Sequence, residues 1–212
     1  MKTTSKTTAE KIDLYKLHKE DYVSPRKPAL LVLKPITYLA IDGQGEPGGA
    51  SFTDRIGALY AMAYTVKMTR KFGGQQDYSV CKLEAQWWGP TGDPDFAHLP
   101  KEEWCWKLMI RTPDFVARGE LEQAVAVLAK RGKSASVKEV RLETIEEGQC
   151  VQMLHVGPYD REGDTIAIMQ AHAEKHGFRF QGRHHEIYLS DPRRVEAERL
   201  KTILREPLAS AR

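Results

Sequence analysis

Two strand-like segments of the chain each place a carboxylate beside aromatic residues. Glu84 is followed at two-residue spacing by Gln86 and Trp88, and Glu186 is followed at the same spacing by Tyr188. Because side chains alternate along a strand, the residues at 84, 86 and 88 share one face of their strand, and those at 186 and 188 share one face of theirs. A buried carboxylate costs several kcal/mol unless it is compensated. The pattern therefore predicts a site for a flat organic ligand, bound by stacking, cation–π attraction and charge pairing.

Other aromatic residues could extend this site. Trp104 and Trp106 are spaced by two, so they share a strand face and belong either to the core or to an aromatic wall around the ligand. Tyr159 follows a Gly-Pro turn and could bring its hydroxyl to the mouth of a cleft. The alternative for Glu186 is an ordinary half-buried strand with a wet outer face. We retain Trp106 and Tyr159 as candidate ligand contacts.

The histidines do not form a recognisable metal motif. His184 and His185 are adjacent, so in a strand they face opposite ways and cannot easily hold one ion together. His172 and His176 have the i, i+4 spacing of helical ligands, but no third ligand follows nearby. The glycine-rich run 43–49 fits neither the GxGxxG nor the P-loop pattern. We predict no metal, no cofactor and no covalent nucleophile.

Composition favours a soluble cytoplasmic protein. The 212 residues are 41% hydrophobic and 29% charged, and the net charge of +3 is spread along the chain rather than clustered, which argues against a nucleic-acid partner. No apolar run is long enough for a membrane span, and Met1–Lys11 resembles a frayed tail rather than a secretory signal. Three widely spaced cysteines (Cys81, Cys105, Cys150) indicate reduced, mostly buried thiols. The oligomeric state stays open.

The order of expected elements repeats along the chain. Periodicity and turn signals predict the order strand, helix, strand, strand in each half, with an extra helix between the halves. In the first half the strands are 36–42, 78–88 and 104–111 and the helix is 51–73, and the extra helix is 120–130. In the second half the strands are 149–156, 182–189 and 200–205 and the helix is 164–176. Pro207 is expected to end the last strand. This order predicts an α+β fold in which tandem modules form antiparallel sheets with a ligand cleft between the halves.

We divide the chain into an arm (1–29) and one ligand-binding domain (30–208) made of two pseudo-repeats, about 30–131 and 140–208. Aligning the second strand of each repeat places Glu84 over Glu186. Both carboxylates are therefore expected to line one cleft.

Five segments resemble the GyrI-like small-molecule-binding domain family: 35–45, 83–88, 110–115, 155–159 and, most specifically, 184–194. The resemblance runs from about Leu30 to Pro207. It implies a tandem pair of strand–helix–strand–strand (SHS2) modules around a ligand cleft. In multidrug-sensing relatives, a buried glutamate at the position of Glu186 engages cationic aromatic ligands. Many relatives also carry a DNA-binding module, for which this chain has no room.

The resemblance further implies a choice of function. Stand-alone members with paired tryptophans look like a branch that detoxifies cyclopropane-bearing, DNA-alkylating compounds by hydrolysis. In that chemistry Glu186 or Glu84 would activate water, and Tyr188 or Tyr159 would stabilise the developing oxyanion. The alternatives are a non-catalytic module that sequesters or senses flat aromatic ligands, and a protein-interaction role such as topoisomerase inhibition.

Overall fold

The computed structural model describes residues 10–92 and 96–211, so most of the expected tail at Met1–Lys11 lies outside the described residues. The described residues form a nine-stranded sheet in which all neighbouring strands are antiparallel, with β7 beside β9 and the others in the order β1-β6-β9-β8-β3-β4-β2-β5. The strands are β1 (Ala29–Leu33), β2 (Ile36–Gln44), β3 (Leu83–Trp88), β4 (Cys105–Arg111), β5 (Arg141–Ile145), β6 (Gly148–Val156), β7 (Phe178–Phe180), β8 (His184–Tyr188) and β9 (Lys201–Ser210).

The described α-helices are α1 (Leu14–Leu17), α2 (Ala50–Phe72), α3 (Arg118–Lys130) and α4 (Glu162–Lys175). Short 3₁₀ turns are η1 (Lys19–Tyr22), η2 (Lys101–Glu103), η3 (Ala135–Glu139), η4 (Tyr159–Arg161) and η5 (Ala197–Arg199). Within the described part of the chain, none of these helices combines the length and the apolar character needed to cross a bilayer.

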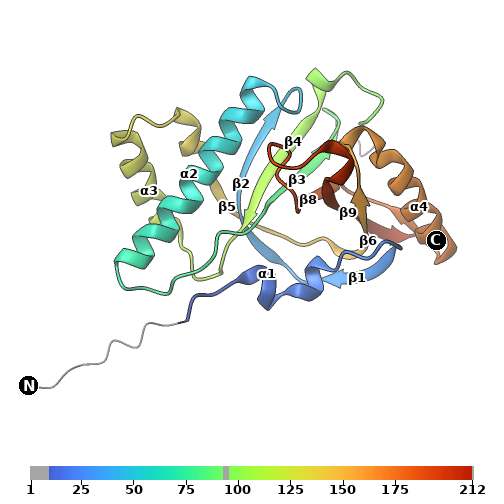
Figure 1. Cartoon of the computed structure of the whole chain (residues 1–212), viewed down its shortest axis with the longest axis horizontal. Coiled ribbons are helices and arrows are strands. Elements are labelled where there is room, and N and C mark those ends of the chain that lie inside the picture. Colours follow the sequence, from blue (N-terminus) through green and yellow to red (C-terminus); the bar gives the residue numbers. More distant parts are fainter. Residues whose placement is uncertain (1–9, 93–95, 212) are drawn as a thin grey trace, which may run out of the picture.

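The predicted α+β fold is confirmed, and the strand–helix–strand–strand order recurs in both halves, with β1, β5 and β7 as additional strands. The first half contains β2, α2, β3 and β4, and the second contains β6, α4, β8 and β9. The two halves join where β3 pairs with β8, so their strands form one continuous sheet. Figure 1 shows α2 and α3 towards one end of the molecule and α4 towards the other, with the strands between them.

The main hydrophobic core lies on the face of the sheet that the long helices cover. Apolar residues of α2, including Leu59 and Met62, join a buried cluster with Leu39 and Leu108 of the sheet. A second, smaller cluster holds α4 against β6 and β9 through residues that include Met169. Because the two helices cover different ends of this face, the central strands β3 and β8 lie between them.

The opposite face is covered in part by the N-terminal arm, where α1 and η1 lie. Tyr22 is buried and its hydroxyl donates to Glu84 (3.2 Å). The carboxylate of Asp21 pairs with Arg111 (2.8 Å), and its carbonyl accepts a hydrogen bond from Nη2 of Arg205 (2.7 Å). The arm is therefore anchored to both halves of the sheet.

Two strand boundaries differ from expectation for identifiable reasons. β9 continues through Pro207 to Ser210, because β7 adds a ladder to residues 208–210 and the Pro207 carbonyl accepts the Gln181 amide hydrogen bond (2.8 Å). β2 continues through Gly43, which pairs with Trp106 of β4. A Cβ at Gly43 would overlap the Trp106 indole, so the bare backbone is what lets that ring pack there.

Candidate functional site

The register between β3 and β8 determines which acidic side chains share a face of the sheet. Ala85 is directly opposite Glu186, and Gln86 is opposite His185. Paired residues of antiparallel strands project to the same face, so Glu84 and Glu186 project to opposite faces of the sheet. The prediction that both carboxylates line one cleft is therefore wrong, because an offset of one residue turns a side chain to the other face.

Glu84 belongs to a closed network on the face that the arm covers. Its side chain is fully buried and accepts hydrogen bonds from the hydroxyls of Tyr22 and Tyr38 (both 3.2 Å). Nε2 of His185 lies 3.0 Å from the same carboxylate, and Nδ1 lies 2.8 Å from Glu147. Burial lowers the pKa of His185, but the negative charge of Glu147 and the hydrogen bonds to both carboxylates more than offset this and raise it. This arrangement is that of a structural ion network.

The same network extends to the far half of the sheet. Arg205, which is fully buried, pairs with Glu147 (3.0 Å) and donates to Gln152 (2.8 Å). Burial alone would raise the pKa of Glu147, but His185 and Arg205 lower it to about 2. These paired charges tie β6, β8 and β9 to the turn between β5 and β6.

A hollow of about 400 Å³ opens beside this network, and its lining includes Gln86, Lys107, Glu147 and Arg183. Of the predicted ligand contacts, only Gln86 lines it, and its amide is engaged with Glu147 (3.2 Å). Trp88 is on the same face, where the Arg183 guanidinium lies 3.6 Å from the centre of its ring. Glu186 and Tyr188 lie on the other face of the sheet.

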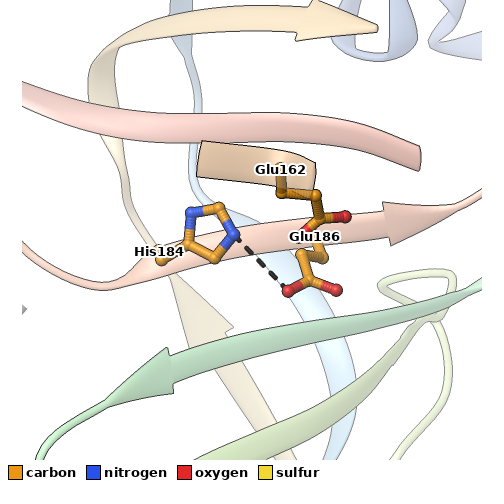
Figure 2. A group of neighbouring side chains, drawn as sticks. All are labelled: Glu162, His184 and Glu186. Carbon is orange, nitrogen blue, oxygen red and sulfur yellow. Dashed lines mark ion pairs between the residues drawn. The ribbon is translucent and has the colours of Figure 1, made fainter. Parts of the chain in front are cut away.

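On the helix-covered face, Glu186 lies in a second group of acids. We call Glu162, His184, Glu186 and Glu206 the carboxyl cluster. Each is at most 8% exposed. Nε2 of His184 lies 3.4 Å from Oε1 of Glu186, and its Nδ1 hydrogen-bonds to Glu206. Figure 2 shows the carboxyl group of Glu162 beside that of Glu186, with His184 turned towards them.

Three elements bring this cluster together. His184 and Glu186 are two apart in β8, so they share a face. Because His185 pairs with Arg205, the following residue of β9, Glu206, lies beside His184 on that face. Glu162 is in the first turn of α4, where a negative charge is favoured by the exposed amides of the helix start.

The cluster contains more acid than base. Burial foremost, and then the charge of Glu186, raise the pKa of Glu162 well above 4.5. Burial lowers the pKa of His184, but Glu206 and Glu186 outweigh it and raise the pKa well above 6.5. Within the described part of the chain, Oε1 of Glu162 is buried without a hydrogen-bond partner. Glu162, His184 and Glu186 each offer one ligand atom within 4.8 Å of the others, so they could hold a metal ion.

Aromatic residues surround the cluster. The rings of Tyr159 and Tyr188 meet edge to face with centroids 6.0 Å apart. Burial and the nearby Glu186 raise the pKa of Tyr159 to about 12 and that of Tyr188 well above 10, so both hydroxyls keep their protons. The Phe96 ring lies 6.3 Å from the His184 ring and stacks on Trp87 at 6.5 Å.

The tryptophans divide between the faces. Trp87, not Trp88, shares the face of Glu186, and its buried indole nitrogen has no hydrogen-bond partner among the described residues. Trp104 contacts Trp87 edge to face at 5.9 Å. Trp106 is fully buried and donates its indole N–H to the carbonyl of Gly45 (3.0 Å), so it belongs to the core.

The sequence pattern predicts Glu186, Tyr188 and Tyr159 as site residues. It does not identify the other three members of the carboxyl cluster. Glu162 follows Tyr159 by three residues, where an acid is usual at a helix start. His184 is adjacent to His185, and strand alternation separates these two histidines without indicating that His184 and Glu186 share a face with Glu206. Glu206 precedes a proline, and alternation with the apolar Leu204 was the signal that could have placed it on the helix-covered face.

Comparison with known proteins places this geometry in context. Residues 27–208 match the profile of the GyrI-like small molecule binding domain. An uncharacterised conserved protein from Listeria innocua has a solved structure with 39% identity and a TM-score of 0.87 over 94% of this chain and 100% of that one. A hydrolase from Listeria innocua is 38% identical over the same shares of each chain, with a TM-score of 0.84.

More distant likeness concerns the fold alone. The C-terminal domain of EcmrR is 11% identical, with a TM-score of 0.55 over 87% of this chain and 98% of that domain. A comparison with curated proteins gave no significant match.

Proposed function

This chain belongs to the GyrI-like small-molecule-binding family, and we propose that it is a hydrolase that adds water to small, flat, electrophilic molecules held beside Glu186. The proposed substrates are cyclopropane-bearing genotoxins, and the consequence is detoxification. Support comes from the Listeria innocua hydrolase, which is 38% identical along its whole length. The assignment to a particular carboxylate rests on the different surroundings of the two candidate acids.

The observation that carries the proposal is the position of Glu186 relative to Glu84. The side chain of Glu186 is 11% exposed and lies beside tyrosine hydroxyls, whereas that of Glu84 has no exposure and is enclosed by three hydrogen-bonding partners. A general base must come within hydrogen-bond reach of the water that it activates. We therefore assign the base to Glu186, and we assign Glu84 to holding the sheet and the arm together.

The proposed reaction begins when Glu186 takes a proton from water as the water oxygen attacks a ring carbon. A bond of the strained ring breaks, and its electron pair moves through the conjugated system to a carbonyl oxygen. The hydroxyl of Tyr188 or Tyr159 stabilises that oxyanion. The oxygen then takes up a proton, and Glu186 releases its own, so the product equals substrate plus one water molecule.

His184 and Glu206 support this base. The imidazole lies between the two carboxylates, with Glu186 on one nitrogen and Glu206 on the other. This arrangement fixes the ring and with it one oxygen of Glu186. The rings of Tyr159, which is 39% exposed, and Tyr188 offer stacking surface for a flat substrate on the same side of the sheet.

The test is incubation of the full chain with a cyclopropane-bearing alkylating compound, followed by mass spectrometry. We expect a product heavier by one water, formed at least 100-fold more slowly by Glu186→Gln. Glu84→Gln is the matched control, because it makes the same change on the paired strand but on the opposite face. At equal folded concentration it should retain most of the activity.

Binding without chemistry is the second candidate, favoured by the small-molecule-binding description of the family. It predicts that the compound quenches tryptophan fluorescence and is recovered unchanged after long incubation. Recovery of intact compound from the wild-type protein, with several such substrates, would reject hydrolysis and leave the sequestering role.

A further inference from the structure

We infer that Glu162, His184 and Glu186 form a binding site for one divalent transition-metal ion, for which Zn²⁺ is the natural probe. The three residues come from α4 and β8 and are all buried. Binding of the ion goes beyond the proposed hydrolysis. Only its effect on turnover rests on the proposed function.

The spacing of the three ligand atoms fits a single ion. Nε2 of His184 and Oε1 of Glu186 are 3.4 Å apart. Two ligand atoms at about 2.0–2.1 Å from a tetrahedral Zn²⁺ are separated by about 3.4 Å. The third ligand atom, on Glu162, lies within 4.8 Å of both, so a modest rotation of that side chain completes three protein ligands. Three protein ligands leave a fourth position for water.

Glu162 contributes a buried ligand atom without a hydrogen-bond partner. Glu162 is only 7% exposed, and its Oε1 has no hydrogen-bond partner within the described residues. A buried carboxyl oxygen without a hydrogen-bond partner is rare, because its desolvation is then uncompensated. Figure 2 shows this carboxyl group directed towards the side chain of Glu186. An ion between them would satisfy it.

The imidazole of His184 also has an outer partner, Glu206. Nδ1 of His184 is held by Glu206, which leaves Nε2 facing Glu186 and Glu162. A carboxylate on the far nitrogen of a histidine is the usual support for a metal-bound imidazole, since it fixes the ring orientation. The cluster therefore contains an outer partner as well as three direct ligands.

Charge and donor type then limit the ion. Three carboxyl groups surround one imidazole in the carboxyl cluster, so a divalent cation supplies missing positive charge. One nitrogen and two oxygens suit Zn²⁺, Co²⁺ or Mn²⁺, whereas Mg²⁺ prefers oxygen ligands and retains most of its water. With an oxygen of Glu186 bound to the ion, the proposed base is withdrawn, so metal binding is expected to inhibit hydrolysis.

A competing location must be separated from this one. His172 and His176 lie one turn apart on α4, with ring centroids at 4.3 Å, and could bind the same ion at the surface. Substituting both with alanine removes that pair and leaves the carboxyl cluster intact. This double variant is the control for the experiment.

The experiment titrates the metal-free full chain with Co²⁺, whose visible spectrum reports its ligands, and with Zn²⁺ in competition with a coloured chelator. We expect one equivalent to bind to the wild-type protein and to the His172→Ala/His176→Ala control. Glu206→Gln, which alters the outer partner of His184, should weaken binding by about 10- to 100-fold, and Glu162→Gln, which alters a direct ligand, should weaken it by at least as much. His184→Ala should abolish it. Circular dichroism establishes that each variant is folded.

Two results would overturn the inference. One is the absence of stoichiometric binding to the wild-type chain, and the other is binding that survives Glu162→Gln and Glu206→Gln but is lost in the surface control. Because the readout is a spectrum, it does not depend on hydrolysis. If Co²⁺ binds as expected but no substrate is turned over, the metal site stands and the proposed hydrolase fails.

Discussion

His184 and His185 are consecutive residues of β8, yet each imidazole lies between two carboxylates on its own face of the sheet. His184 lies between Glu186 and Glu206 on the helix-covered face. His185 bridges Glu84 and Glu147 on the face that the N-terminal arm covers. One strand therefore carries a buried acid cluster on one side, in which the Glu186 side chain is 11% exposed, and a closed ion network on the other. Substitutions on the two sides should have different effects.

Removal of the Tyr22 hydroxyl tests the closed network. Tyr22→Phe deletes a buried donor to Glu84 and should lower the free energy of unfolding by about 1–3 kcal/mol. Urea denaturation followed by tryptophan fluorescence measures it. Tyr64→Phe, at a residue that is 54% exposed, is the control and should change stability by less than about 0.5 kcal/mol. Equal stability of the two variants would show that the arm contributes nothing through this bond.

Glu147 predicts how stability depends on pH. Its pKa in the folded protein is about 2, against an ordinary value of 4.5, so its contribution is fully present above about pH 5 and is lost as the pH falls towards 2. The full contribution is on the order of 3 kcal/mol. Urea unfolding at pH 6, 5, 4 and 3 should reveal this slope, a decrease in the free energy of unfolding as the pH falls.

Glu147→Gln provides the comparison for that slope. The amide cannot titrate, so the variant should be less stable at pH 6 and should lose less additional stability between pH 5 and pH 3. Parallel curves for the two proteins would assign the acid sensitivity to other carboxyl groups.

Two glycines with different surroundings test the packing of Trp106. Gly43→Ala should destabilise the protein by about 1–3 kcal/mol, because its methyl group would overlap the indole ring. Gly57→Ala, within α2, meets no atom within 4 Å and should stabilise the protein by about 0.5–1 kcal/mol through helix propensity. Thermal melts of both variants measure the difference, and a shift of the same sign in both would contradict the proposed close contact.

Tyr188→Phe tests the oxyanion donor of the proposed reaction. The hydroxyl keeps its proton at neutral pH, since burial and Glu186 raise the pKa of Tyr188. Its loss should lower kcat by about 100-fold, while KM changes much less. Initial rates of product formation measure both constants. A raised KM with unchanged kcat would instead place Tyr188 in substrate binding, and Tyr159→Phe shows whether the second hydroxyl takes the role.

The strands that carry the acids were predictable, because alternation and turn residues act locally. The faces onto which Glu84 and Glu186 project could not be predicted, because they depend on the register between β3 and β8. In this register Ala85, and not Glu84, is opposite Glu186. The prediction that the last strand ends at Pro207 was wrong for a related reason. A proline ends a strand only where its missing amide is needed, and β7 lengthens the ladder beyond Pro207.

The members of the carboxyl cluster show a second limit of sequence reasoning. Glu162 precedes Glu186 by 24 positions and comes from a different type of element. Its local setting is that of a common acidic residue at a helix start. Its burial against another carboxyl group follows only from how α4 packs on β6 and β7, which no local pattern encodes.

The hydrogen bond from Arg205 to the carbonyl of Asp21 joins residues that are 184 positions apart. During synthesis from the N-terminus, the arm leaves the ribosome long before β9 exists, so its partners in the second half become available in two steps, first Gln152 of β6 and then Arg205 of β9. The hydrogen bond to Arg205 is thus among the last contacts of the arm to form. The contacts of the arm with Glu84 and Arg111 need only β3 and β4, so the arm can engage the first half of the sheet before Arg205 fixes it to the second.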